Sequence, residues 1–85
     1  MSYGLVITEE VSAMVKSPPM DEFTHEMFVH AMLDLPLDPH GVGTLVRPEG
    51  AFTTRTLAVG SHGLITYVVD ETTATVTVVD VTWLG

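Results

Sequence analysis

The chain has 85 residues, enough for one small domain with a modest hydrophobic core. It contains 3 basic and 11 acidic residues, for a formal net charge of −8, and no cysteine. This composition excludes disulfide bonds and thiolate metal sites, and it argues against a protein that grips nucleic acid through a Lys/Arg patch.

The acidity is consistent with a well-solvated surface or with a basic partner. The start of the chain lacks the basic and apolar regions of a signal peptide, and no apolar stretch reaches membrane-spanning length. We therefore expect a cytoplasmic protein without membrane contact. No internal repeat or linker divides the chain, so we expect residues 1–85 to form a single domain.

The N-terminal part predicts a strand followed by a helix. Residues 3–8 form a short apolar run, and Thr8 can cap the helix that follows it. Val11 and Val15 are spaced for one inward face of that helix. The prolines at 18–19 should end it.

A second helix is expected over residues 21–35, with Asp21 as its N-cap. Its apolar residues suggest an inward stripe, with Met20 and Met32 at the edges of that stripe. The expected stripe residues are Phe23, Met27, Phe28, Ala31 and Leu35. Residues 37–43 should form a loop and residues 47–50 a turn, because both stretches contain proline and glycine.

Residues 51–83 predict the sheet. Three stretches rich in valine, threonine and aromatic residues are separated by short breaks at 60–63 and 70–73. Such breaks are too short for crossover connections, so the strands should form an antiparallel meander. The expected fold is α+β, in the order β-α-α-β-β-β, with two helices on one face of a mainly antiparallel sheet and the opposite face partly open.

In the last predicted strand, the alternation of apolar and polar residues shifts by one position. Val76 and Val78 alternate with threonines, whereas Val79, Val81 and Trp83 follow the other parity. A β-bulge would re-aim the strand at this point, and burial of both faces would also explain the pattern. The sequence leaves both alternatives open.

The histidines do not predict a metal site. His25 and His30 are five residues apart, which places their rings roughly 140° apart around a helix. A zinc-protease helix needs two histidines four residues apart. Ser61 and His62 share a turn without an acid to orient the imidazole, although His62 could move protons near neutral pH.

Arg55 lies in an apolar strand and therefore needs a carboxylate, carbonyl or phosphate partner. A structural salt bridge and the binding of an anion are both compatible with this position. No glycine-rich phosphate loop and no pair of active-site carboxylates stand out.

Five segments resemble the RelE/ParE toxin superfamily of bacterial toxin–antitoxin modules. They are residues 3–10 (YGLVITEE), 32–50, 54–60 (TRTLAVG), 64–71 (LITYVVDE) and 74–81 (ATVTVVDV). The resemblance implies two helices against one face of a sheet. It also implies either mRNA cleavage on the ribosome by acid–base attack of the 2′-OH, as in many members, or gyrase poisoning, as in the ParE branch.

The sequence also departs from that family. Leu64 occupies the position of the arginine in the family's R-I-I-Y strand, and the C-terminal histidine or tyrosine of the nuclease branch is absent. Arg55 matches the strand arginine of the R-x-x-x-V-G segment, and Arg47 lies in the corresponding loop. By this resemblance Arg55 would stabilise the phosphate, His62 would move protons and Arg47 would assist.

The expected function is therefore the toxin-like component of a toxin–antitoxin pair, with a small antitoxin as partner and no cofactor or metal. Ribosome and mRNA binding are implied by the resemblance but disfavoured by the net charge, and a homodimer stays open. The alternative is a non-catalytic interaction module on the same fold. A positive patch around Arg47 and Arg55 would favour the nuclease, and a negative open face would favour the module.

Overall fold

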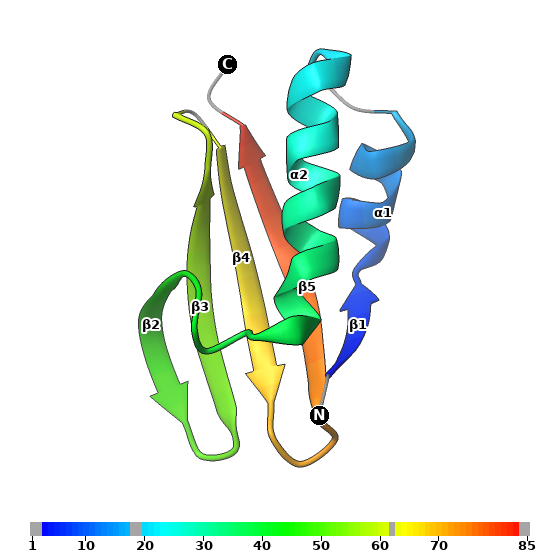
Figure 1. Cartoon of the computed structure of the whole chain (residues 1–85). Helices are drawn as coiled ribbons and strands as arrows, with labels where there is room; N and C mark the ends of the chain where they lie inside the picture. Colours follow the sequence, from blue (N-terminus) through cyan, green and yellow to red (C-terminus); the bar gives the residue numbers. More distant parts are fainter. Residues whose placement is uncertain (1–2, 18–19, 62, 84–85) are drawn as a thin grey trace.

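The computed structural model describes residues 3–17, 20–61 and 63–83. Its elements follow the chain as strand, two helices, a short 3₁₀ turn and four strands (Figure 1). Their bounds are β1 Gly4–Ile7, α1 Glu9–Lys16, α2 Glu22–Asp34, η1 Leu35–Leu37, β2 Thr44–Glu49, β3 Phe52–Val59, β4 Gly63–Asp70 and β5 Thr75–Trp83.

All strands join one five-stranded sheet in the order β1-β5-β4-β3-β2. β1 pairs with β5 in parallel, and the other three pairs are antiparallel. Figure 1 shows both helices over the same face, with β2 and β3 extending beyond them on one side. The predicted α+β class, with two helices on one face of a mainly antiparallel sheet, is confirmed.

β2 is a strand that the sequence analysis did not predict. The expected turn at 47–50 begins later, because β2 continues to Glu49 and the chain reverses at Gly50 and Ala51. Gly50 has a φ of 63°, a conformation that glycine adopts without strain. All six residues of β2 are exposed, so neither face of the strand is buried. The sequence TLVRPE accordingly lacks the alternation of apolar and polar residues that would have predicted a strand. Pro48 is tolerated because β2 lies at the edge of the sheet.

Both predicted helix caps are present. The Thr8 hydroxyl accepts a hydrogen bond from the Val11 amide at 3.3 Å, and the Asp21 carboxylate accepts one from the Thr24 amide at 2.8 Å. Each side chain satisfies an amide that has no partner within the helix. The predicted end of the first helix falls at residues 18–19, which lie outside the described residues, and α1 itself ends at Lys16.

The core lies between the helices and the central strands β4 and β5. Its fully buried apolar residues come from both layers: Val11, Phe28, Met32 and Leu35 from the helical segments, and Val59, Ile65, Tyr67, Val69, Val76 and Val78 from the strands. Met27, Ala31 and Val15 pack against this core while remaining partly exposed.

Phe23 was wrongly predicted as a core residue, since 72% of it is exposed. Phe28, Met32 and Leu35 form the buried stripe, at spacings of four and three residues. Phe23 lies five residues before Phe28 and therefore roughly 140° away around α2. The expected stripe had combined two neighbouring rows of the helix.

The change of parity in the last strand is a β-bulge. Tyr67 pairs with Val78 and Thr66 pairs with Asp80, so Val79 has no direct partner on β4. The extra residue turns Val76 and Val78 toward the core before it and Val81 and Trp83 toward the same side after it. Of the two alternatives, the bulge is confirmed.

The two phenylalanines of α2 test this assignment. Phe28→Ala removes a side chain that is only 1% exposed and should lower the free energy of unfolding by about 3–5 kcal/mol. The matched change Phe23→Ala, at the exposed position, should change it by less than about 0.5 kcal/mol. Urea unfolding followed by circular dichroism measures both. Equal losses would mean that the helix is rotated from the orientation described.

Candidate functional site

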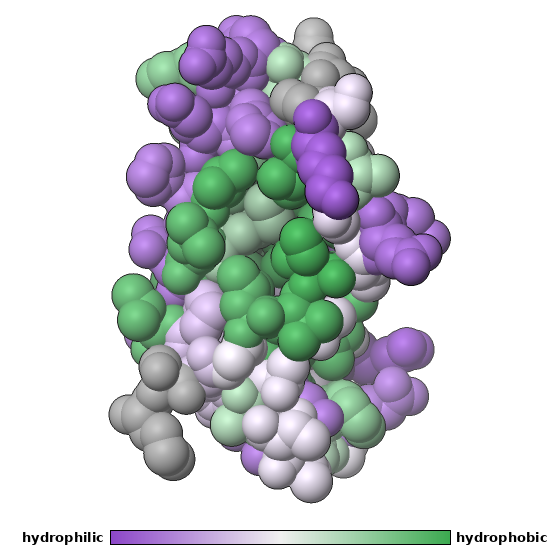
Figure 2. All heavy atoms as spheres, turned by 90° about the vertical axis from the view of Figure 1, so that its right-hand side faces the viewer, coloured by the Kyte–Doolittle hydropathy of each residue, from purple (hydrophilic) through white to green (hydrophobic). Residues whose placement is uncertain are grey.

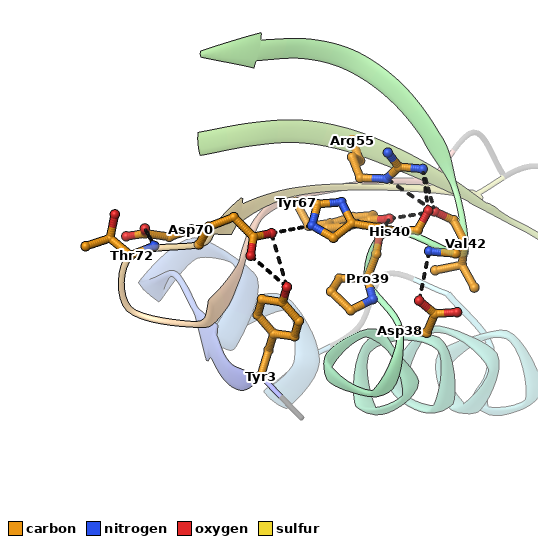
Figure 3. A network of polar contacts seen from close by, with 11 residues as sticks. Tyr3, Asp38, Pro39, His40, Val42, Arg55, Tyr67, Asp70 and Thr72 are labelled. Carbon is orange, nitrogen blue, oxygen red and sulfur yellow. Dashed lines mark hydrogen bonds and ion pairs between the residues drawn. The ribbon is translucent and has the colours of Figure 1, made fainter. Parts of the chain in front are cut away.

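Arg55 lies on β3 and faces the helix side of the sheet, opposite Tyr67 on β4. Its guanidinium holds the loop between η1 and β2, residues 38–43 (Figure 3). Nη2 donates to the backbone carbonyls of His40 and Val42 at 3.1 Å and of Gly43 at 3.3 Å, and Nε donates to Val42 at 3.3 Å. The sequence predicted a carboxylate, carbonyl or phosphate partner for Arg55, and in the structure its partners are backbone carbonyls.

Tyr67 holds the same loop from inside the core. Its side chain is fully buried, and its hydroxyl lies 2.9 Å from the Pro39 carbonyl and 3.0 Å from the Val42 carbonyl. A buried hydroxyl needs such a partner to offset its loss of water. Gly43 allows the close approach, because a Cβ there would lie 2.7 Å from the Tyr67 hydroxyl and 2.5 Å from the Thr56 carbonyl oxygen.

The outer end of the same network ties three distant segments together at the surface. The Glu71 carboxylate accepts hydrogen bonds from the Tyr3 hydroxyl, at 2.8 and 3.1 Å, and from His40 Nε2 (Figure 3). The His40 contact, followed by the Tyr3 hydrogen bond, lowers the pKa of Glu71. The hydrogen bond to Glu71 raises the pKa of Tyr3. The network thus links the start of β1, the loop 38–43 and the β4–β5 turn.

Of the residues that the resemblance placed in one site, Arg47 and Arg55 face opposite sides of the sheet. Arg47 pairs with Thr54 and therefore faces the open side of the sheet, whereas Arg55 faces the helix side. His62 lies outside the described residues.

The open face carries little positive charge. Arg47 Nη2 lies 3.9 Å from Glu49 Oε2, and Asp70 and Asp80 face the same side. Leu64, at the position of the family's arginine, also faces this side and is 39% exposed. The rest of the face is mostly threonine: Thr44, Thr54, Thr56, Thr66, Thr75, Thr77 and Thr82. Among the described residues, no positive patch forms around Arg47 and Arg55.

The sequence analysis treated residues 37–43 only as a loop and missed its anchoring. The signal was present in the sequence as two glycines flanking Val42, close to Pro39, and as a single tyrosine in a mainly aliphatic strand. Neither feature identifies the other as its partner, because 25 residues separate Val42 from Tyr67.

Hollows lie on both sides of α2. One, with a volume of about 450 Å³, lies between α2 and the end of β3 and includes Phe23, Met27 and Val59 in its walls. Another, of about 150 Å³, lies between β1, α1 and α2 and has only apolar walls: Leu5, Ile7, Val15, Val29, Met32 and Leu33. Figure 2 shows the side of the molecule that carries α1, with apolar side chains gathered around a depression.

None of the described helices is long and apolar enough to cross a membrane. Within the described ranges, no three His, Asp or Glu side chains lie close enough together to hold a metal ion.

The Tyr67 hydroxyl is the first test of the loop anchor. Tyr67→Phe keeps the ring but leaves the buried Pro39 carbonyl without this donor, so the free energy of unfolding should fall by about 1–3 kcal/mol. Tyr3→Phe, which removes an exposed hydroxyl, is the matched control and should have a much smaller effect. Urea titration compares the two variants, and an equally small effect of both would contradict the anchoring role.

The contacts of Glu71 predict a pH dependence. The pKa of Glu71 is lowered from its ordinary value of 4.5, so its contribution to stability is complete above that value and is lost as the pH falls through the lower, folded-state pKa. The difference in melting temperature between the native chain and Glu71→Gln should therefore be constant near neutral pH and shrink in acid. Repeating the series in Tyr3→Phe should narrow the difference, since Tyr3 supplies one of the two hydrogen bonds. A difference that grows in acid would contradict the assignment.

No protein-family model matches the sequence, and no curated protein is similar to it in sequence. Solved structures match its fold over nearly the whole chain. A chain of the archaeal RelE–RelB complex from Pyrococcus horikoshii OT3 superposes with a TM-score of 0.82 at 15% identity, covering 100% of this chain and 98% of that one. A chain of the toxin–antitoxin complex RelBE2 from Mycobacterium tuberculosis gives 0.72 at 18% identity, covering 98% and 99%.

The free Escherichia coli toxin RelE, with two arginines replaced by alanine, superposes with a TM-score of 0.67 at 16% identity, covering 98% of this chain and 84% of that one. These identities are low, so the likeness concerns the fold. It confirms the arrangement that the five resembling segments implied: two helices over one face of the sheet, in the same order along the chain. The chain has the fold of the RelE toxins.

Proposed function

We propose that this chain is the toxin-like component of a toxin–antitoxin pair and that it acts by binding a small antitoxin protein. The observation that carries this proposal is the superposition on RelE chains over 98–100% of the sequence. Two of those structures are complexes of the toxin with its antitoxin. A shared fold does not by itself transfer an activity, so the site must be weighed separately.

We further propose that the chain keeps the fold without efficient RNA cleavage. Stabilising charge on a scissile phosphate is usually the largest catalytic contribution, and it requires donors that converge on one point. Arg55 and Arg47 face opposite sides of the sheet, and the Arg55 guanidinium is already bonded to three carbonyls. The net charge of −8 also opposes docking to RNA. These features support the interaction module over the ribosome-dependent nuclease.

In the nuclease alternative, Arg55 would stabilise the phosphate, His62 would move protons and Arg47 would assist. That arrangement would require the 38–43 loop to release Arg55, since its Nη2 atom now donates to that loop. It would also bring Arg55 and Arg47 together from opposite faces. The two proposals therefore predict different results when the chain is produced alone.

Expression of the chain alone in bacteria should cause little growth arrest and leave mRNA intact, because Arg47 and Arg55, on opposite faces of the sheet, do not converge on one site for RNA. Growth curves and primer-extension mapping of a reporter mRNA measure this. Strong arrest with mRNA cleavage, abolished by Arg47→Ala without loss of folding, would overturn the non-catalytic proposal. Arg47 suits this variant because it is exposed and pairs only loosely, at 3.9 Å, with Glu49.

The partner is tested separately, by co-expression of this chain with a candidate small antitoxin from the same organism. The expected result is a complex that survives size-exclusion chromatography and raises the melting temperature, since a ligand of the folded state stabilises it. Separate elution of the two proteins would contradict the antitoxin assignment.

A further inference from the structure

The upper half of β3 has an edge that no other described strand covers. β2 begins at Thr44, which pairs with Thr56, so residues 57–59 pair only with β4. Figure 1 shows β2 beside only the lower part of β3. The backbone groups on that side of a strand are a template for one more strand. An extended segment placed there would continue the line of β2.

The larger hollow opens onto this free edge. One row of α2, formed by Phe23, Met27 and Ala31, makes one wall, and Val59 and Gly60 belong to the other. An adjoining hollow of about 280 Å³ shares Phe23, Met27, Val59 and Gly60 and is also lined by Ser61. These residues together form what we call the α2–β3 groove. An added strand would direct alternate side chains toward it.

The rim of the groove is acidic. Glu22, Glu26, His30 and Asp34 follow one another at four-residue intervals along α2, and all four are exposed. Glu26 and His30 belong to the groove itself. The three cations of the chain lie elsewhere: Lys16 ends α1, Arg47 is beside Glu49, and Arg55 is bonded to the 38–43 loop.

We propose that the free β3 edge and the α2–β3 groove bind an extended, basic segment of the partner protein. The inference rests on the proposed function, because it identifies the surface and the chemistry by which the antitoxin binds. The backbone of the segment pairs with residues 57–59, its apolar side chains enter the groove beside Phe23, and its lysines or arginines face Glu26. A second copy of this chain, also at −8, would bring like charges together.

The probe is a short fluorescent peptide of alternating valine and lysine, with a valine–glutamate peptide of the same length and a leucine–lysine helical peptide as comparisons. Fluorescence anisotropy with the purified chain should show binding of the valine–lysine peptide and at least tenfold weaker binding of the valine–glutamate peptide. Hydrogen exchange should show new protection of those amides within 57–59 that point away from β4 in the complex. Both measurements use the folded chain and need no toxicity.

Two substitutions locate the site. Phe23→Ala and Glu26→Lys should each weaken binding by about fivefold or more, since anchoring aromatics and facing charges contribute most at such contacts. Phe52→Ala and Glu49→Lys are the matched controls, because Phe52 is 51% exposed and both residues lie on the opposite face of the sheet. The controls should leave binding unchanged, and melting temperatures verify that all four variants are folded.

Three results would overturn the inference: no binding of the valine–lysine peptide, equal binding of the two strand peptides, or no dependence on Phe23 and Glu26. Preferred binding of the helical peptide without protection at 57–59 would overturn it as well, because the groove would then accept a helix. If the co-expression test fails but the valine–lysine peptide binds, the antitoxin role is refuted and the peptide-binding surface stands. Antitoxin binding that Phe23→Ala and Glu26→Lys do not weaken would refute the surface alone.

Discussion

The structure depends on how the 38–43 loop, which connects the helical layer to β2, is anchored to the sheet by Tyr67 and Arg55. The chain must leave the helical layer after η1 and enter the sheet at β2, and its backbone carbonyls at 39–43 have no strand to pair with in between. Buried carbonyls need donors. Tyr67 supplies one from within the core and Arg55 supplies others from the neighbouring strand. The position of β2, and with it the shape of the sheet edge, follows from where these two side chains hold the loop.

That anchoring determines what Arg55 is available to do. The Arg55 guanidinium donates from Nε and Nη2 to three carbonyls of one loop. In this chain Arg55 contributes to the fold, and the open face carries mostly threonines, with carboxylates and with Arg47 beside Glu49. The RelE fold is thus retained while the described cations are dispersed.

The acidic row of α2 and the exposed apolar residues beside the free edge of β3 both favour the binding of a basic, extended segment at that edge. Phe23 and Met27 lie beside a strand edge that β2 does not reach, and an acidic row runs along the same helix. Exposed aromatic surface next to unpaired backbone is costly for an isolated protein, because it favours unwanted pairing. A partner segment that covers both would remove that cost. The acidity of the rim sets the sign of charge such a segment must carry.

Much of the fold could be predicted from local sequence. The caps at Thr8 and Asp21 and the meander of β3, β4 and β5 each depend on residues close together in the chain, and the change of parity near Val79 is visible there too, although it left a bulge and burial of both faces as alternatives. These features follow from hydrogen bonds and side-chain alternation within a few residues. The sequence by itself therefore determined the order of most elements and the class of fold.

Tertiary structure decided the rest. β2 has six exposed residues and forms because β3 offers it an edge, so no alternation announced it. Phe23 lies outside the core because only one of the two apolar rows of α2 can face the sheet, and the row containing Phe28 does so. The partners of Arg55 are carbonyls 12 to 15 residues away, chosen by the path of a loop. Apolar periodicity and residue type predict whether a side chain will be buried or will require a hydrogen-bond partner. Only the tertiary structure determines which group becomes that partner, because the partners are distant in sequence.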